Sequence, residues 1–246
     1  MSIITKTTIA LLLIISGNLS AQTKIYTTNS FEFLFQNGQV TKDGVNPDQN
    51  MRFTLWLNYT HQKHVDFNKN LGIFTGVSIK NVGFITEKEI FKSTNDLGEK
   101  VESIPYETIK RRIYTLGIPL ALKIGDVEKN FYVYGGGEIG LALAYKEKRF
   151  ENSVKKSKTS FLGSETNLFQ PSIFTGIQLP GGLNIQYRLF LNNMLKQDYG
   201  NGTEYDQSGF SKSLIQYISI CFNLGSKDWK KYGITYSNKT NEIKSM

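Results

Sequence analysis

Residues able to do metal or acid–base chemistry are scarce in this chain of 246 residues. The only histidines, His61 and His64, lie three residues apart in THQKHVDF, and the only cysteine is Cys221. Two histidines can bind a metal, but no cysteine and no dense set of carboxylates accompanies this pair. We therefore predict that both histidines are solvated residues of a turn, and that the chain has no catalytic residue, no metal site and no cofactor.

Two other stretches could bind phosphate groups. The segment GGGEIG, residues 135–140, is rich in glycine, but it does not open a helix after a strand as a nucleotide-binding loop does. The segment KEKRFENSVKKSK, residues 146–158, is strongly basic. In an exported chain it would meet no nucleic acid, so its lysines would sooner contact the phosphates of lipopolysaccharide. The simpler interpretation is a solvated loop.

The N-terminal residues predict export. MSIITKTTIALLLIISGNLSAQ has one lysine, a short apolar run and a small-residue end, which is the layout of a secretory signal peptide. The apolar run is too short for a membrane-spanning helix, which needs about 20 residues. We predict a signal peptide over residues 1–21, and the ending SAQ is similar to export signals of Bacteroidota. With one cysteine the chain cannot form an internal disulfide.

The stretch RRIYTLGIPLALKIG, residues 111–125, shows which elements could position polar side chains. It alternates strictly, as a β-strand with two different faces does. One face is apolar throughout and the other is small or polar, ending in Lys123. In a soluble sandwich the apolar face would pack on a second sheet, whereas in a membrane barrel it would face lipid.

The same period of two recurs in eight segments: 31–36, 51–61, 71–80, 111–125, 130–146, 168–180, 183–193 and 213–224. Long and short connections alternate between them, with long polar stretches at about 81–110 and 147–167. Outer-membrane barrels have long outer loops and short periplasmic turns. We predict an all-β, eight-stranded, up-and-down antiparallel transmembrane β-barrel over residues 22–224, with a polar tail over 225–246. The long loops would lie outside the cell and the tail in the periplasm.

Aromatic residues near the predicted strand ends agree with a membrane position, because outer-membrane barrels carry aromatic girdles at both interfaces. These residues are Tyr59, Tyr114, Phe131, Phe169 and Phe222.

Four stretches resemble the PorT-like outer-membrane β-barrel family of Bacteroidota. They are IYTLGIPLALKIG, FYVYGGGEIGLALAY, GIQLPGGLNIQYRLFLNNML and QYISICFNL, which together cover residues 113–224. Two features depart from the family pattern: the chain continues beyond the last strand, and QYRLF reverses the usual order of Arg and Tyr. The resemblance implies an outer-membrane barrel with a link to protein secretion.

Charged residues on the small and polar faces predict an ion-pair network inside the barrel. Glu138 and Arg188 both fall on the inward face, near the middle of the membrane span, on strands separated by one neighbour. Buried charges are costly unless paired, so we predict that these two belong to one network. Glu32, Arg52 and Lys123 are candidates for further members.

An eight-stranded barrel has room inside only for its own side chains, so a diffusion pore is disfavoured. We predict a monomeric, non-enzymatic protein with an anchoring, interaction or secretion-assembly role. Its partners would be outer-membrane lipid, lipopolysaccharide, and secretion or envelope proteins, with no nucleic acid. The alternatives are a soluble periplasmic barrel that binds a small apolar ligand, and a surface lipid or peptide hydrolase. A hydrolase would place a histidine near the outer rim, where the predicted topology has none.

Overall fold

A computed structural model describes residues 23–89, 92–94, 100–102, 106–151, 154–200 and 205–224. The predicted signal peptide, 1–21, and the predicted tail, 225–246, lie outside the described residues. Among the residues that the structure does describe, no helix is long and apolar enough to cross a membrane.

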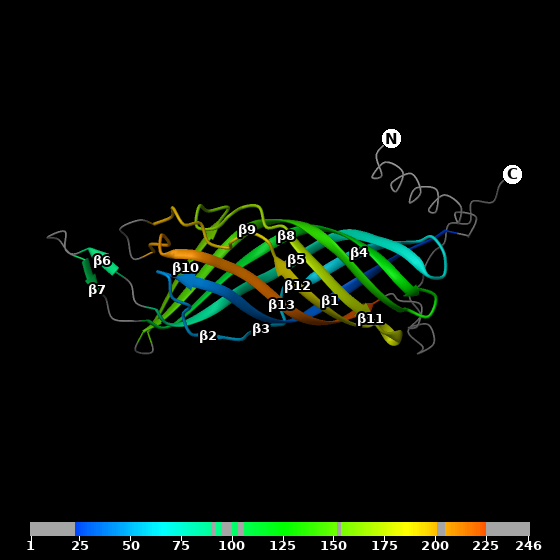
Figure 1. Cartoon of the computed structure of the whole chain (residues 1–246), viewed down its shortest axis with the longest axis horizontal. Coiled ribbons are helices and arrows are strands. Elements are labelled where there is room, and N and C mark those ends of the chain that lie inside the picture. Colours follow the sequence, from blue (N-terminus) through cyan, green and yellow to red (C-terminus); the bar gives the residue numbers. More distant parts are fainter. Residues whose placement is uncertain are drawn as a thin grey trace, which may run out of the picture.

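The described chain forms a closed antiparallel barrel of eight strands, as predicted (Figure 1). Each strand pairs with the next along the chain, and the last strand pairs with the first, which closes the ring. The strands are β1 (Lys24–Lys42), β4 (Tyr59–Asp66), β5 (Leu71–Glu89), β8 (Tyr106–Asp126), β9 (Phe131–Glu151), β11 (Ser172–Gln178), β12 (Leu183–Phe190) and β13 (Phe210–Leu224).

Shorter elements lie beside the eight strands or between them. β2 (Gln49–Asn50) pairs with β5, and β3 (Arg52–Thr54) pairs with β1. β6 (Lys92–Thr94) and β7 (Lys100–Glu102) form a separate hairpin, which Figure 1 shows beyond one end of the barrel. β10 (Val154–Phe161) continues the sheet beside the last part of β9, and the 3-10 helix η1 (Pro180–Gly182) joins β11 to β12.

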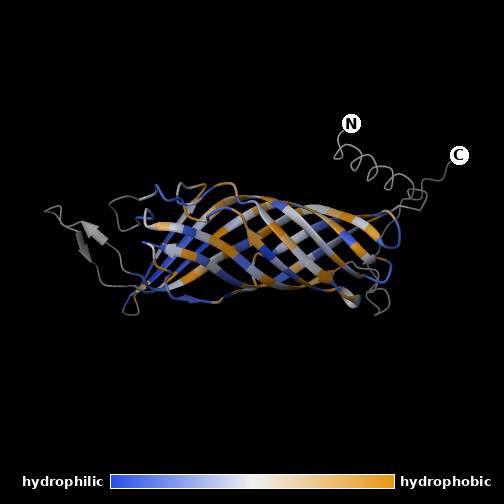
Figure 2. Ribbon diagram, in the orientation of Figure 1, coloured by the Kyte–Doolittle hydropathy of each residue, from blue (hydrophilic) through white to orange (hydrophobic). Residues whose placement is uncertain are grey.

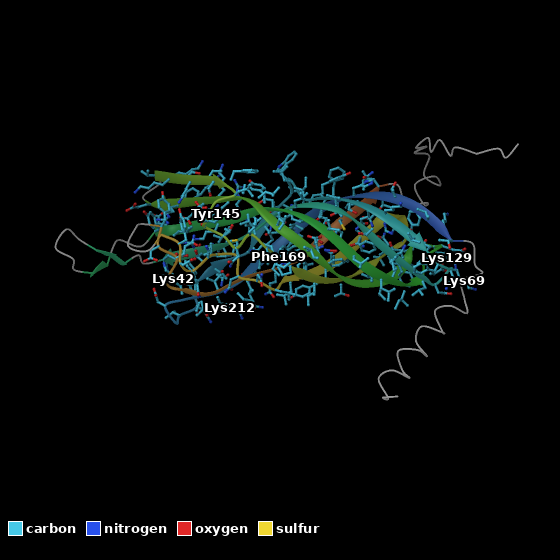
Figure 3. All side chains as sticks on the ribbon, turned by 90° about the horizontal axis from the view of Figure 1, so that it is seen from above. Lys42, Lys69, Lys129, Tyr145, Phe169 and Lys212 are labelled. Carbon is cyan, nitrogen blue, oxygen red and sulfur yellow. The ribbon has the colours of Figure 1, made fainter. Side chains whose placement is uncertain are left out.

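The two ends of the barrel differ in their connections. Short turns at 67–70, 127–130 and 179–182 share one end with the start of β1 and the end of β13. The long connections all lie at the opposite end. Figure 3 shows Lys69 and Lys129 at the short-turn end, and Lys42 and Lys212 toward the other. The alternation of long and short gaps in the sequence therefore corresponds to the two ends of the barrel.

The apolar face of each strand points outward and the polar face points inward. On β8 the run of alternate residues from Leu116 to Ile124 is exposed, with Ile118 at 63% exposure, whereas Lys123 is fully buried. Exposed apolar residues recur on the other strands, and Figure 2 shows hydrophilic segments gathering toward the two ends. This arrangement is inside-out relative to a soluble sandwich and matches a barrel whose wall faces lipid.

The strands are longer than the sequence analysis predicted. Residues 81–110 and 147–167 were expected to be loops, but β5 runs to Glu89, β8 starts at Tyr106 and β9 runs to Glu151. The β5–β8 ladder extends as far as Glu89 opposite Tyr106. The outward apolar pattern stops at Tyr114, which misled the prediction, while inward alternation continues through Ile113, Arg111 and Ile109. Tyr114 thus marks the edge of the apolar wall and not the end of a strand.

The predicted strand at 51–61 is interrupted. Between β3 and β4, residues 55–58 leave the ladder, and Leu57 has a positive φ of 62°. Asn58 replaces the missing strand bonds: its carbonyl accepts from the Glu32 N–H (3.1 Å), and its Oδ1 accepts from the Asn81 N–H (2.8 Å). One buried asparagine therefore satisfies the neighbouring backbone on both sides of the break.

Candidate functional site

All five residues singled out by the sequence analysis are buried inside the barrel: Glu32, Arg52, Lys123, Glu138 and Arg188. The structure brings two of them together, with 2.9 Å between Arg188 Nη1 and Glu138 Oε2. The same nitrogen donates to Ser172 Oγ at 2.9 Å, and the guanidinium lies 4.4 Å from the centre of the Phe174 ring. Among the described residues, Arg188 is the one ion-pair partner of Glu138.

Glu32 pairs with Lys80, a fully buried lysine that faces it from β5. Thr60 lies between the two groups: its hydroxyl accepts from Lys80 Nζ (2.7 Å) and donates to Glu32 Oε1 (3.0 Å). The alternation of residues 71–80 places Lys80 on the polar face of its strand, but the sequence contains no signal that would match it to Glu32. The two residues are 48 positions apart in the chain.

Lys123 and Arg52, the candidates for further members, contact other groups among the described residues. Lys123 pairs with Asp66 near the short-turn end. Arg52 reaches the interruption between β3 and β4, where it donates to the backbone carbonyl of Asn81 at 3.0 Å and to its side-chain oxygen at 2.6 Å. Their ion-pair and hydrogen-bond partners thus differ from those of Glu138 and Arg188, whereas Glu32 interacts electrostatically with Arg188.

The prediction that both histidines are solvated turn residues was wrong, because β4 extends through them. His61 points outward, and its Nδ1 lies 2.8 Å from Asn29 Oδ1. His64 points inward and is buried; its Nε2 lies 2.9 Å from Thr28 Oγ1, and its ring stacks on Tyr26.

The neighbours of His64 do not form a hydrolytic triad. A triad orients the imidazole with a carboxylate at Nδ1, but here Lys123 Nζ occupies that place, 3.2 Å away. A cation there opposes the imidazolium that would form on proton transfer, and Thr28 is buried as well. No group of three or more His, Cys, Asp and Glu able to hold a metal occurs within the described residues.

A second charged cluster, which the sequence analysis missed, fills the barrel beyond Tyr114. We call it the outer cluster: Lys42, Glu89, Arg111, Glu147 and Arg149. Arg111 binds Glu89 through both terminal nitrogens (Nη2–Oε2 2.8 Å) and Glu147 through Nε (3.2 Å). Lys42 also pairs with Glu89 (3.2 Å), and Arg149 also pairs with Glu147.

Aromatic rings and hydroxyls complete the outer cluster. Arg111 lies 4.9 Å from the centre of the Phe210 ring, Arg149 lies 4.4 Å from that of Tyr205, and Tyr145 donates to Glu147. Burial alone would raise the pKa of Glu89, but Arg111 and Lys42, with hydrogen bonds from Arg111 and Thr86, lower it to about 2. Burial likewise opposes ionisation of Glu147, and Arg111 and Arg149 lower its pKa below the ordinary value.

The space left inside the barrel is small and polar. A cavity lined in part by Glu32 has mainly polar side chains around it, among them Ser30, Gln62, Asn184, Gln186 and Asn223. Apolar inward residues pack into separate clusters, one around Phe74 and Phe174 and one around Phe190 and Tyr217. The interior is thus packed with the barrel's own side chains, as expected for eight strands.

No family model matches the chain, and no curated protein matches its sequence. Among solved structures it is similar to Ail, the attachment invasion locus protein of Yersinia pestis, at 11% identity and a TM-score of 0.38, covering 82% of this chain and 98% of that one. It is also similar to a structure of Ail in complex with the heparin analogue sucrose octasulfate, at 12% identity and a TM-score of 0.36, covering 80% of this chain and 96% of that one. Membership of the PorT-like family stays a prediction.

Proposed function

We propose that this chain is a non-enzymatic β-barrel of the bacterial outer membrane, with its long connections outside the cell and its short turns in the periplasm. The observation that supports this is the exposed apolar wall. On β8 it runs from Ile124 to Tyr114. At about 3.3 Å per residue and a tilt of about 40°, this stretch spans about 25 Å, the height of the apolar band of such barrels.

The interior disfavours the alternatives. A soluble barrel that binds an apolar ligand needs an apolar lumen, whereas the inward faces here carry ion pairs and a polar cavity. A surface hydrolase needs an accessible nucleophile and base, whereas Thr28 and His64 are buried beside a lysine. An anchoring, interaction or secretion-assembly role remains, with envelope or secretion proteins as partners of a monomeric barrel.

The membrane proposal is tested by extraction and by gel mobility. Closed barrels satisfy their strand hydrogen bonds internally and resist unfolding in detergent. We expect detergent, and not a salt wash, to extract the protein, and we expect unboiled and boiled samples to migrate differently on a detergent gel. Release by salt together with identical mobility would overturn the proposal.

Sidedness is tested with single cysteines in a Cys221→Ser background. Lys155 on β10 and Glu128 in a short turn are both exposed but lie at opposite ends of the barrel. We expect a membrane-impermeant maleimide to label Lys155→Cys on intact cells and Glu128→Cys only after the outer membrane is opened. The reverse pattern would invert the proposed orientation.

A further inference from the structure

The outward face of the barrel changes abruptly from apolar to cationic just beyond Tyr114. On β8 the next two outward residues are Arg112 and Lys110, and on β9 the outward residues after Ala144 are Lys146 and Lys148. Lys155 continues the same face on β10, where it lies opposite Phe150. We call Lys110, Arg112, Lys146, Lys148 and Lys155 the basic face.

Like charges in the basic face lie directly opposite each other. In the β8–β9 ladder Lys110 is paired with Lys148, and Arg112 with Lys146. Direct cross-strand pairs of like charge destabilise a sheet. Burial, together with the four other cations of the basic face, lowers the pKa of Lys148 below its ordinary value.

Nothing in the described part of the chain neutralises these cations. None of the five forms an ion pair with a described carboxylate. The β5 residues opposite Lys110 and Arg112 are Ile85 and Gly83, which are uncharged. The carboxylate of Glu87 is hydrogen-bonded to Asn50 instead. Their inward neighbours Arg111 and Arg149, by contrast, are paired within the outer cluster. The lumenal cations Arg111 and Arg149 are therefore paired with carboxylates, whereas the cations of the basic face have no described carboxylate as an ion-pair partner.

Hydroxyl groups and a lipid-facing position indicate what that anion is. Ser157 and Thr159 on β10 lie opposite Lys148 and Lys146 and face the same side. Lysine, arginine and hydroxyl groups together are the donors that phosphate accepts from. The face also borders the apolar wall on the same strands, at Tyr114 and at Phe161, which is 72% exposed. That position sets it at headgroup depth.

We infer that the basic face binds the phosphate groups of the glycolipid in the outer leaflet. This inference rests on the proposed outer-membrane function, and it names a partner for the protein. Each cation near an anionic membrane surface adds to the attraction, so five of them on one face make a substantial site. The site would hold the lipid against the wall of the barrel and fix its depth.

The test uses the full mature chain refolded into detergent micelles, with diphosphoryl lipid A as the probe and its dephosphorylated form as the reference. We expect the folded protein to prefer the diphosphoryl form by at least about tenfold in dissociation constant. Replacing all five residues of the basic face with glutamine should reduce that preference to within about twofold. The control variant changes five exposed or part-exposed lysines away from the basic face to glutamine and should retain the preference: Lys63, Lys69, Lys129, Lys196 and Lys212.

Three results would overturn the inference: no preference in the folded wild type, equal loss in the control variant, or full competition by inorganic phosphate, which would indicate a general anion site. The same samples are checked on an unboiled detergent gel. A wild type that fails to form a heat-modifiable barrel would count against the outer-membrane proposal itself. A heat-modifiable wild type with no phosphate preference would remove only the lipid site.

Discussion

Two regions of the lumen hold buried charges in different ways. At the level of the apolar wall each carboxylate has one cation within ion-pair distance, as in Glu138 with Arg188 and Glu32 with Lys80, although Arg188 also interacts electrostatically with Glu32. Beyond Tyr114 they are shared: Glu89 contacts both Arg111 and Lys42, and Glu147 contacts both Arg111 and Arg149. A one-to-one pair fails completely when one member is lost, whereas a shared cluster keeps a partner for each remaining charge.

The largest effect is expected where a pair has no substitute. Arg188→Met leaves Glu138 buried without its cation and should lower the free energy of unfolding by ~3–5 kcal/mol, with lumenal water reducing the loss. Urea unfolding in detergent micelles measures it. The double variant Glu138→Gln with Arg188→Met should lose less than the two single changes added together. Strict additivity would show that the two side chains do not interact.

A smaller effect is expected from the same kind of change in the outer cluster. Arg111→Met removes more hydrogen bonds than Arg188→Met does, but Glu89 keeps Lys42 and Glu147 keeps Arg149. We expect a loss of about 2 kcal/mol in the same urea assay. A loss larger than that of Arg188→Met would mean that a second ion-pair partner does not reduce the cost of losing the first, and the proposed difference between the two regions would be wrong.

These two regions also differ in how far the sequence could predict them. Alternation in the apolar segments identified the barrel, its strand count and the inward position of Glu138, Arg188 and Lys123. It could not match Lys123 to Asp66 or Glu32 to Lys80, because partners across a barrel depend on the register of strands far apart in the chain.

The outer cluster was missed for a different reason. Where the barrel extends beyond the apolar wall, its outward face is polar and its inward face mixes apolar with charged residues. The sequence therefore assigned Glu147 to a loop and Arg111 to the first residue of a strand, without a partner for either. The signal that could have identified them was the inward series Ile109, Arg111, Ile113 and Thr115, which keeps a period of two without an apolar outer face.

Acid should also weaken the contribution of the outer cluster to stability, because the pKa of Glu89 is lowered in the folded protein. In the unfolded chain this carboxyl takes up a proton near its ordinary pKa of 4.5, whereas the folded protein holds it ionised down to about 2. Its contribution is therefore complete above about pH 5 and is lost progressively as the pH falls toward about 2.

The urea midpoint of wild type and of Glu89→Gln, followed over that range, measures this contribution. The difference in urea midpoint between the two proteins should shrink on acidification, because Glu89 in the wild type becomes protonated and neutral, whereas glutamine is neutral at every pH. A difference that stays constant with pH would show that Glu89 does not titrate as the geometry requires.

The smallest effect is expected from removing the hydroxyl that Tyr145 donates to Glu147. This change tests directly whether the partners of Glu147 compensate for one another. Tyr145→Phe should cost about 1 kcal/mol, because Glu147 still has Arg111 and Arg149 to bind it. The same change should cost more in an Arg111→Met background, where Glu147 has lost one of its two cations and depends more on the hydroxyl. Urea unfolding of the two single variants and the double variant gives this coupling. If Tyr145→Phe costs the same in both backgrounds, the bonds to Glu147 act independently, and the outer cluster is a set of separate pairs like those at the level of the apolar wall.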